Sequence, residues 1–252
     1  MGVSDLAAIR EDALLGGKVR LLQPLAGYRA ATDPVLLAAA VPAEPGERVL
    51  DLGCGAGAAM YCLAARIGRV HLSGLEREAT YLDLAQRNAD LNGRRAELHL
   101  GCVSRAPLAL RQQSFDHVIA NPPYHAPTDL GSVVQLRDRA HREEVPLGAW
   151  IATALARLLP RGRLTLIHRA ERLGEILGHL TDRAGDIAVK PLAAREGRDA
   201  KRVIVTARKG TRGPLRLTAP FILHDGPAHL ADAEDFTAEA RAILRDGAPL
   251  QI

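Results

Sequence analysis

The sequence contains little cysteine and no recognisable set of metal ligands. Its 252 residues include three cysteines that form no CxxC pair, at positions 54, 62 and 102. An odd, scattered count favours free thiols in a reducing cytosol over a disulfide framework. The nine histidines are dispersed as well. We therefore expect a cytoplasmic protein with no structural disulfide and no metal site.

Long apolar segments are also missing. No run of about 18 apolar residues appears, so no membrane span is expected, and the first ten residues lack the three-part layout of a signal peptide. The chain is 47% hydrophobic and 25% charged, which is typical of a globular protein with one sizeable core. The sequence shows no internal repeat and carries no sign of an oligomeric state.

Short apolar runs alternate with helical stretches from residue 47 onward. This alternation predicts βαβ units and a mostly parallel sheet. We expect strands at residues 48–52, 70–76, 97–100, 115–120, 163–167, 187–190 and 202–208. We expect helices at residues 58–67, 79–91, 147–159 (ended by Pro160) and 170–184. The prediction is a doubly wound α/β fold with a seven-stranded sheet, formed by residues 46–252.

Residues 1–45 precede this alternation and are expected to form an extension that packs over the active site. The extension should contain a β-hairpin around Gly16-Gly17 and Gly27, then a helix at 34–41 with Thr32 or Asp33 as its N-cap. Residues 125–141 lack periodicity and predict a loop, for which an active-site lid is one interpretation. Beyond residue 216 we expect a short strand and a helix at 238–245.

A glycine-rich turn follows the first strand of the alternation, in the sequence Asp51-Leu-Gly-Cys-Gly-Ala-Gly57. Such a turn lets the backbone approach a ligand at the carboxyl edge of a sheet, and Glu76, which ends the next strand, can accept hydrogen bonds from ribose hydroxyls. The relaxed dinucleotide pattern Gly53-x-Gly55-x-x-Ala58 is also satisfied, so a nicotinamide enzyme and a purely structural turn stay open. Asp51 favours S-adenosylmethionine, because its carboxylate can pair with the methionine ammonium.

A second motif, Asn121-Pro122-Pro123-Tyr124, follows the fourth strand. In isolation such a tetrapeptide is usually a turn. At this place the Asn121 side-chain oxygen and the Pro122 carbonyl can accept hydrogen bonds from an NH2 group, which aims the nitrogen lone pair and stabilises the growing positive charge. Tyr124 offers a face for stacking a planar substrate, worth about 1–3 kcal/mol per base. The motif predicts methyl transfer to a planar nitrogen.

Basic residues gather in one part of the chain. The net charge of +4 and the pI of about 9.2 favour an acidic partner only mildly. Residues 195–216 hold eight Lys or Arg against two acids. A solvated surface and a contact with an RNA phosphate backbone both fit this pattern. The second interpretation makes Arg202 and Arg208 candidate RNA contacts.

The two motifs together resemble those of class I S-adenosylmethionine-dependent methyltransferases, and nearly the whole chain is similar to the bacterial tRNA1(Val) adenine-N6 methyltransferases. The N-terminal similarity covers Leu22-Gln23-Pro24-x-x-Gly27-Tyr28-Arg29 and Asp33-Pro-Val-Leu-Leu37. The C-terminal similarity covers Lys201-Arg202-Val203, Ala207-Arg208-Lys209-Gly210, Pro214-Leu215 and Leu223-His224. The resemblance implies S-adenosylmethionine as cofactor, tRNA as partner and N6-methylation of the adenine beside the anticodon.

The resemblance also assigns roles to single residues. The implied catalytic residues are Asn121, Pro122 and Tyr124. The implied cofactor residues are Asp51, Gly53, Cys54, Gly55, Gly57, Glu76, Arg77, Cys102 and Asn121. The implied substrate residues are Gln23, Tyr28, Arg29 and Asp33, for which hairpin and capping structure is the alternative, together with Arg202 and Arg208. One departure is Gly101-Cys102-Val103, where such enzymes often carry an acid that meets the cofactor adenine, so Cys102 can also be simply a small buried side chain.

Other functions stay open at this point. Similar tetrapeptides serve protein-glutamine N5 and ribosomal RNA guanine-N2 methyltransferases. The former usually carry a helical N-terminal domain, for which about 45 residues are too few, and the latter commonly carry a larger or duplicated partner domain. A small-molecule methyltransferase, including one acting on oxygen, is a further alternative. Outside this class, an NAD-dependent oxidoreductase and a non-catalytic RNA-binding protein are the other interpretations.

Overall fold

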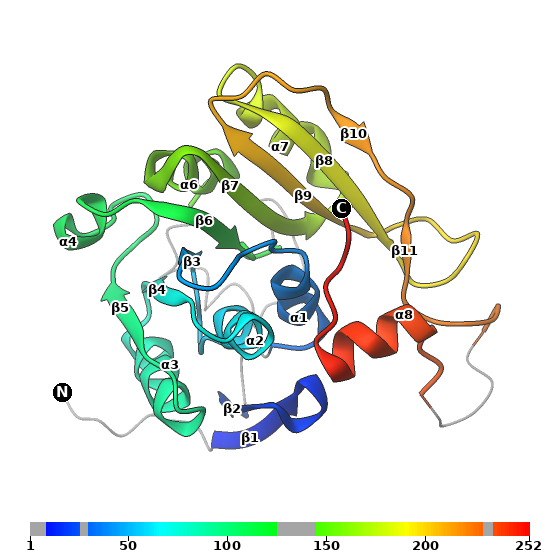
Figure 1. The fold of residues 1–252 in the computed structure, drawn as a ribbon, viewed down its shortest axis with the longest axis horizontal. Helices are drawn as coiled ribbons and strands as arrows, with labels where there is room; N and C mark the ends of the chain where they lie inside the picture. The colour runs from blue at the N-terminus through cyan, green and yellow to red at the C-terminus, as the bar shows by residue number, and fades with distance from the viewer. Residues whose placement is uncertain (1–8, 26–29, 125–144, 229–233) are drawn as a thin grey trace, which may run out of the picture.

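A central twisted sheet organises the computed structural model, which describes residues 9–25, 30–124, 145–228 and 234–252 (Figure 1). The strand order is β10-β8-β9-β7-β6-β3-β4-β5, and β11 also pairs with β8. The strands are β3 (Arg48–Leu52), β4 (His71–Glu76), β5 (Ala96–Leu100), β6 (Phe115–Ala120), β7 (Leu158–Arg169), β8 (Ala184–Ala193), β9 (Arg202–Lys209), β10 (Arg216–Leu217) and β11 (Phe221–Ile222). Among these, β9 alone runs antiparallel to its neighbours. The mostly parallel sheet is therefore confirmed, with two short strands added to the seven predicted.

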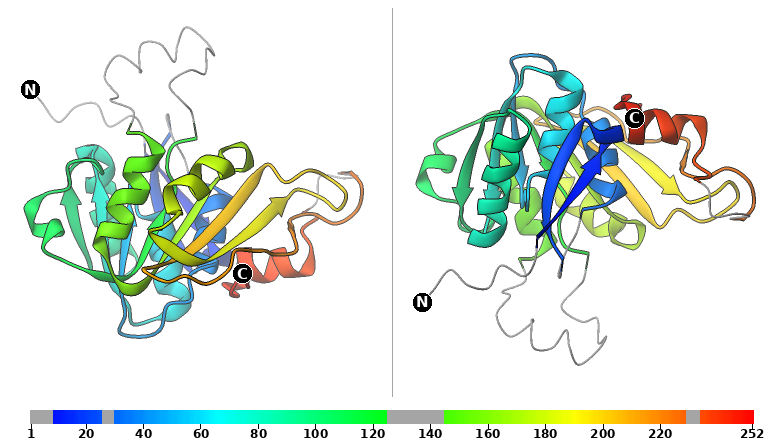
Figure 2. Two further views of the ribbon diagram at one scale, coloured as in Figure 1. Left: turned by 90° about the horizontal axis from the view of Figure 1, so that it is seen from above. Right: turned by 90° about the horizontal axis from the view of Figure 1, so that it is seen from below.

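Helices cover both faces of this sheet (Figure 2). They are α1 (Thr32–Ala39), α2 (Ala58–Ile67), α3 (Ala79–Leu91), α4 (Leu108–Arg111), α6 (Leu147–Arg157), α7 (Leu173–Leu180) and α8 (Ala238–Arg241), which a π-helical turn continues over Ala242–Asp246. Successive strand residues point to opposite faces. Accordingly Val49 packs in the apolar cluster of α1, α2 and α3, whereas Leu50 packs in that of α4, α6 and α7. The doubly wound architecture follows from this alternation.

The N-terminal hairpin is fixed to the rest of the molecule by asparagines. Strands β1 (Ile9–Leu14) and β2 (Val19–Pro24) pair in antiparallel register through a 3-10 turn at Leu15–Gly17. The side chain of Asn88 in α3, which is fully buried, accepts a hydrogen bond from the Leu22 amide and donates one to the Leu22 carbonyl. The hairpin predicted around Gly16-Gly17 is confirmed, whereas Gly27 lies outside the described residues.

Several predicted boundaries were wrong. Helix α1 begins at Thr32, and its N-cap is Ala31 with no side-chain cap, because the Asp33 carboxylate bonds elsewhere. Helix α6 ends at Arg157, and Pro160 lies inside β7 rather than closing the helix. The pairing of β6 with β7 is irregular before Arg163, so the missing proline N–H costs no ladder bond there.

The predicted helix over residues 170–184 was also too long. It divides into a 3-10 turn (Ala170–Arg172) and α7, and the following strand β8 starts early at Ala184, opposite Lys209. The loop predicted at residues 125–141 lies outside the described part of the chain. Within that part, no helix is long and apolar enough to cross a membrane. All three cysteines are free, as predicted.

Candidate active site

Both sequence motifs lie at the carboxyl ends of adjacent parallel strands. Strand β3 stands between β4 and β6, and Leu52, its last residue, pairs with Leu75 on one side and Ala120 on the other. The chain leaves β3 into the glycine-rich turn and leaves β6 into Asn121. Because the strand order turns back at β3, this edge is where ligands bind in open α/β sheets.

The three glycines of the turn have different surroundings, although all have positive φ. A Cβ on Gly53 would lie 2.5 Å from the Trp150 ring, and one on Gly57 would lie 2.2 Å from the Tyr61 ring. A Cβ on Gly55 would meet nothing within 4 Å. Gly53 and Gly57 are therefore required by packing, whereas Gly55 presents its backbone to open space.

Cys54, between these glycines, turns its side chain into the core. It is buried, and its Sγ lies 2.8 Å from where a Cβ on Gly74 of β4 would stand. Burial raises the pKa of the Cys54 thiol well above its usual value. This residue can meet a ligand through its backbone but not through a reactive sulfur.

Two buried carboxyl groups flank the turn. Asp51 is 3% exposed, and the Met60 amide at the start of α2 donates to it. Burial, and to a lesser extent the charge of Glu76, raises the pKa of Asp51 to about 8. Within the described residues no cationic side chain pairs with Asp51. Such a carboxyl group fits the ammonium of a bound ligand, whose charge would replace the missing partner.

Glu76 is oriented by backbone amides. One carboxylate oxygen accepts from the Gly55 amide at 2.9 Å, and the other accepts from the Arg77 and Glu78 amides at 2.8 and 2.9 Å. The carboxylate thus faces the glycine turn from the end of β4. The Arg77 side chain points to Glu78 instead, with 3.3 Å between the Arg77 Nε and a carboxylate oxygen.

Cys102 reaches the same edge from the neighbouring strand. It follows β5, and the amide of the preceding Gly101 donates to the Glu76 carbonyl at 2.8 Å. Its side chain is partly buried, with its Sγ 3.2 Å from the Ser104 Oγ. The structure therefore brings Cys102 beside Glu76, as a small sulfur side chain and not as a charged group.

Tyr124 joins three distant segments of the chain. Its hydroxyl donates to the Asp33 carboxylate of α1 at 2.6 Å, and the other oxygen of that carboxylate pairs with the Arg202 guanidinium at the start of β9. Its ring meets the edge of His168 in β7, with 5.3 Å between ring centroids and 62° between planes. Asn121 is partly buried and Pro122 is buried beside this group. Asp33 thus connects the N-terminal extension to the second motif.

His168 was not foreseen from the sequence. It is 1% exposed, and burial, followed by the charge of Arg172, lowers the pKa of His168 to about 4, so the ring is neutral at physiological pH. The sequence did place it directly after the predicted strand end at Ile167, a position that could have marked it as a site residue. Trp150 packs over Gly53, and nothing in the sequence indicated this contact because the two residues are far apart in the chain.

The candidate substrate residues separate in the structure. Asp33 and Arg202 meet at Tyr124. Gln23 is buried, where its amide accepts from the Ala30 amide at 2.6 Å and donates to Asp12 at 2.9 Å, which favours the structural alternative. Tyr28 and Arg29 lie outside the described residues.

Arg208 lies at the opposite edge of the sheet. It stands six residues after Arg202 in β9, which is about 20 Å along a strand. It pairs with Arg163 near the amino-proximal part of β7, whereas Arg202 pairs with Arg169 at the carboxyl end. The two predicted arginines therefore lie at different edges of the sheet, and only Arg202 is at the catalytic edge.

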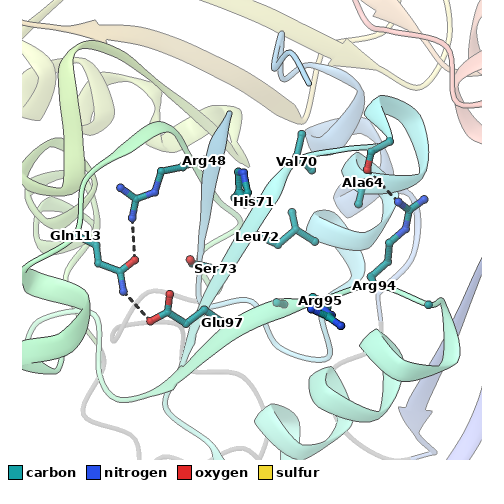
Figure 3. Close-up of a pocket in the computed structure, with 13 residues that line it drawn as sticks. Arg48, Ala64, Val70, His71, Leu72, Ser73, Arg94, Arg95, Glu97 and Gln113 are labelled. Carbon is teal, nitrogen blue, oxygen red and sulfur yellow. Dashed lines mark hydrogen bonds between the residues drawn. The ribbon is translucent and has the colours of Figure 1, made fainter. Parts of the chain in front are cut away.

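A cavity of about 710 Å³ also lies at the amino edge, away from both motifs (Figure 3). It is lined by the first residues of β3, β4 and β5, and within it Arg48 donates to Gln113, which donates to Glu97, at 3.0 and 2.7 Å. Its position excludes it as the site of the two motifs. Within the described residues, no group of three or more His, Cys, Asp or Glu could hold a metal ion.

Comparison with known families agrees with this site. The family model described as the methyltransferase small domain matches residues 31–177, more than half of the chain. The chain belongs to this family. The match includes both motifs and Asp33, and it confirms the predicted methyltransferase class with a cofactor of the S-adenosylmethionine type.

Relatives with assigned names are similar over part of the chain. A tRNA1(Val) (adenine(37)-N6)-methyltransferase from Shewanella halifaxensis is 28% identical over 182 residues, which are 71% of this chain and 74% of the relative. The protein of the same name from Porphyromonas gingivalis is 30% identical over 161 residues, 59% of this chain and 61% of the relative. These similarities agree with the family that the motifs indicated.

Solved structures share the fold. A protein from Agrobacterium tumefaciens described as a predicted O-methyltransferase is 30% identical, with a TM-score of 0.71 over 87% of this chain and 99% of that one. The T. thermophilus 16S rRNA N2 G1207 methyltransferase is 20% identical, with a TM-score of 0.60 over 83% of this chain and 52% of that one. The second likeness supports the methyltransferase fold alone.

Proposed function

We propose that the protein methylates the N6 amino group of an adenine in tRNA, the one beside the anticodon, using S-adenosylmethionine. The observation that carries this proposal is Asn121 at the end of β6, next to the glycine-rich turn of β3 and followed by a Tyr124 held by Asp33. The names of the Shewanella and Porphyromonas relatives supply the substrate. A tRNA substrate and three free cysteines also agree with a cytoplasmic location.

The cofactor would be held by groups from both sides of the turn. Asp51 would pair with its ammonium, and Glu76 would accept from its ribose hydroxyls while the Gly55 backbone makes close approach possible. Gly53, Cys54 and Gly57 would shape the backbone, and Cys102 and Arg77 stand where the adenosine end would lie. When bound, the cofactor supplies an electrophilic methyl group on a positively charged sulfur.

Asn121 and Pro122 would prepare the acceptor. An exocyclic amine is a weak nucleophile because its lone pair is delocalised into the ring. Two acceptors, the Asn121 side-chain oxygen and the Pro122 carbonyl, would bind the two amine protons. They would thereby favour a pyramidal nitrogen, whose lone pair is localised and aimed at the methyl group. The nitrogen would gain the methyl group as the methyl–sulfur bond breaks and a neutral thioether leaves. The nitrogen would then be cationic and release a proton to water, so no base is needed before attack. The bonds to Asn121 and Pro122 strengthen as positive charge develops.

Tyr124 would stack on the target base. The Asp33 carboxylate and the neutral His168 ring hold its phenol from two sides, so its ring needs little reorganisation when a base arrives. Arg202 compensates the charge of Asp33 and is thereby occupied, which makes it a support of the site instead of a phosphate contact.

The second candidate is an oxygen acceptor on a small molecule, favoured by the description of the Agrobacterium structure. An oxygen nucleophile would need a base to remove its proton, and His168 is buried and weakly basic, with its Nδ1 accepting from the Arg169 amide. Asn121 has no corresponding task in that chemistry. The two acceptors of the second motif therefore favour nitrogen.

One experiment distinguishes the acceptors. Labelled S-adenosylmethionine is incubated with the protein and with tRNA, ribosomal RNA, protein or small-molecule fractions, and the labelled product is hydrolysed and identified. We expect N6-methyladenosine from tRNA. N2-methylguanosine, methylglutamine or a methylated small molecule in its place would contradict the proposal, and complete absence of transfer would leave a binding protein.

A further inference from the structure

Three arginines and one aspartate lie near one another at the amino edge of the sheet. Arg163 of β7 and Arg208 of β9 are directly opposite each other in an antiparallel pair. In the strand order β10-β8-β9-β7, Arg216 begins β10 and Asp186 lies in β8, which stands between β10 and β9. These four residues are called the basic cluster below. They lie away from the catalytic edge, so the candidate active site gives no reason for their clustering.

The basic cluster is electrostatically incomplete. Residues directly opposite on antiparallel strands point to the same face with Cβ atoms about 4.5–5.5 Å apart, and like charges there are destabilising. Burial, then the charges of Arg208 and Arg216, lowers the pKa of Arg163, against a raising effect of Asp186. The Arg208 Nε is buried and has no hydrogen-bond partner in the described structure. Buried donors normally have a partner, so this one indicates a missing acceptor.

The backbone around the cluster is tightly built. The pairing of β8 with β9 shifts register between Gly185 and Ala188, and Asp186 in this irregularity has a φ of 48°. A Cβ on Gly213 would lie 1.6 Å from the Asp186 carboxylate, and one on Gly185 would lie 2.5 Å from the Thr211 carbonyl. The segment after β9 is thus packed against the bulge, which fixes the Asp186 carboxylate against Gly213.

We propose that the basic cluster binds phosphate groups of the RNA backbone, as a second contact remote from the methylated base. Guanidinium groups match phosphate oxygens in geometry and lose less hydration than ammonium groups do. A phosphate would supply the acceptor that the Arg208 Nε lacks. It would also offset positive charge on Arg163 and Arg208, whereas Arg216 already donates to the carbonyl of Ile252, the last residue. The proposal rests on the proposed function, because the RNA must also reach Asn121.

The position of the cluster defines the kind of RNA. Arg202 at the catalytic edge and Arg208 in the cluster are about 20 Å apart along β9. A nucleoside or a dinucleotide cannot span this distance, whereas a folded RNA can. The substrate class is therefore an extended, structured RNA, which contacts the protein at both edges of the sheet.

The test compares variants of the full chain for binding of unmodified tRNA across roughly 50 to 200 mM salt. Arg208→Gln and Arg216→Gln, singly and together, remove cluster charges, and Arg87→Gln on the exposed face of α3 is the matched control. Each cluster variant should weaken tRNA binding about eightfold near 0.1 M salt and lower the salt slope by about 1. The control and the affinity for S-adenosylmethionine should stay at wild-type values. If Arg208→Gln fails to fold, the exposed Arg216 still carries the test.

The outcomes separate this inference from the proposed function. If wild-type protein methylates tRNA and the cluster variants bind tRNA normally, the cluster has no RNA role. Calorimetric titration with inorganic phosphate tests whether the cluster binds a free phosphate ion instead of RNA. If the variants lose phosphate binding but keep wild-type tRNA affinity, the ligand of the cluster is the free ion. If the variants lose tRNA affinity but the wild-type methylates another acceptor, the inference stands and the proposed function falls.

Discussion

At the scale of the residue, Tyr124 is the side chain that joins the second motif to α1 and β7. The motif predicted a ring for stacking, and that expectation depends only on the residue type and its place after a strand. It assigned no task to the hydroxyl. The structure changes this expectation, because the hydroxyl donates to Asp33, which lies 91 positions away in sequence. A side-chain contact over such a separation leaves no trace in local spacing.

The loss of Asn121 should reduce turnover more than any other single change in the second motif. Its acceptor bond strengthens toward the transition state, and removal of such a group typically costs about 2.7–4 kcal/mol, roughly a hundredfold to a thousandfold in rate. Asn121→Asp should be milder than Asn121→Ala because it keeps an acceptor. Single-turnover methylation of tRNA measures the rate, and cofactor titration should give near wild-type affinity. An Asn121→Ala protein with most of its activity would reduce the motif to a turn.

Tyr124→Phe should slow methyl transfer, although it keeps the stacking ring. The substitution removes a hydrogen bond to a charged acceptor, a contact worth about 1.5–3 kcal/mol. We expect a rate about tenfold lower, and a larger loss for Tyr124→Ala. Asp33→Asn also weakens the pairing with Arg202, but it should lower the rate less in the Tyr124→Phe protein than in wild type, because the hydroxyl bond is already absent there. Additive effects in this double-mutant cycle would show that the hydroxyl bond does not position the ring.

At the scale of elements, the strands of the sheet could be predicted from apolar runs, whereas several ends could not. Helix α6 and strand β7 adjoin without a loop, so Pro160 looked like the end of the helix although it lies in an irregular part of the strand. The antiparallel direction of β9 could not be predicted from the apolar runs either. Because β9 runs antiparallel, its first residue, Arg202, lies at the catalytic edge and Arg208 lies at the opposite edge. A count of basic residues cannot show this.

The glycine-rich turn allows a matched pair of substitutions. Gly55→Ala places a methyl group in open space at a φ of 54°, so it should weaken cofactor binding severalfold and reduce stability by about 1 kcal/mol. Gly57→Ala drives a methyl group into the Tyr61 ring, so it should lower the melting temperature much more strongly. Calorimetric titration and thermal unfolding of both variants check this. Equal cofactor affinity for Gly55→Ala and wild type would place the ligand elsewhere.

At the scale of the whole molecule, charge is distributed unevenly between the two edges of the sheet. The catalytic edge holds buried carboxyl groups, Asp51 and Glu76, which suit a cationic cofactor, and the amino edge holds arginines in excess, which suit phosphate. The net charge of +4 conceals this division. The sequence predicted the positions of both acids, because each ends or nearly ends a strand, where position follows from the fold class.

Asp51 connects the site to the stability of the whole chain. Its pKa is raised from 3.8 to about 8 in the folded protein without cofactor, chiefly by burial. A raised carboxyl pKa stabilises the folded state fully below the unfolded value, and that contribution is lost as pH rises from about 4 through about 8. Asn at this position never ionises, and its side-chain oxygen can still accept from the Met60 amide. Asp51→Asn should therefore unfold at a higher temperature than wild type at pH 8.

The same substitution should abolish the response to cofactor. At pH 8, S-adenosylmethionine should raise the melting temperature of wild type, because the bound ammonium pairs with the carboxylate, and should leave Asp51→Asn almost unchanged. The advantage of Asp51→Asn without cofactor should shrink toward zero as pH falls to about 4, where the wild-type carboxyl group is protonated in both states. Thermal unfolding of both proteins over this pH range, with and without cofactor, is the measurement. A wild-type protein that is the more stable of the two at pH 8 without cofactor would mean that Asp51 has a cationic partner already, and its assignment to the cofactor ammonium would be wrong.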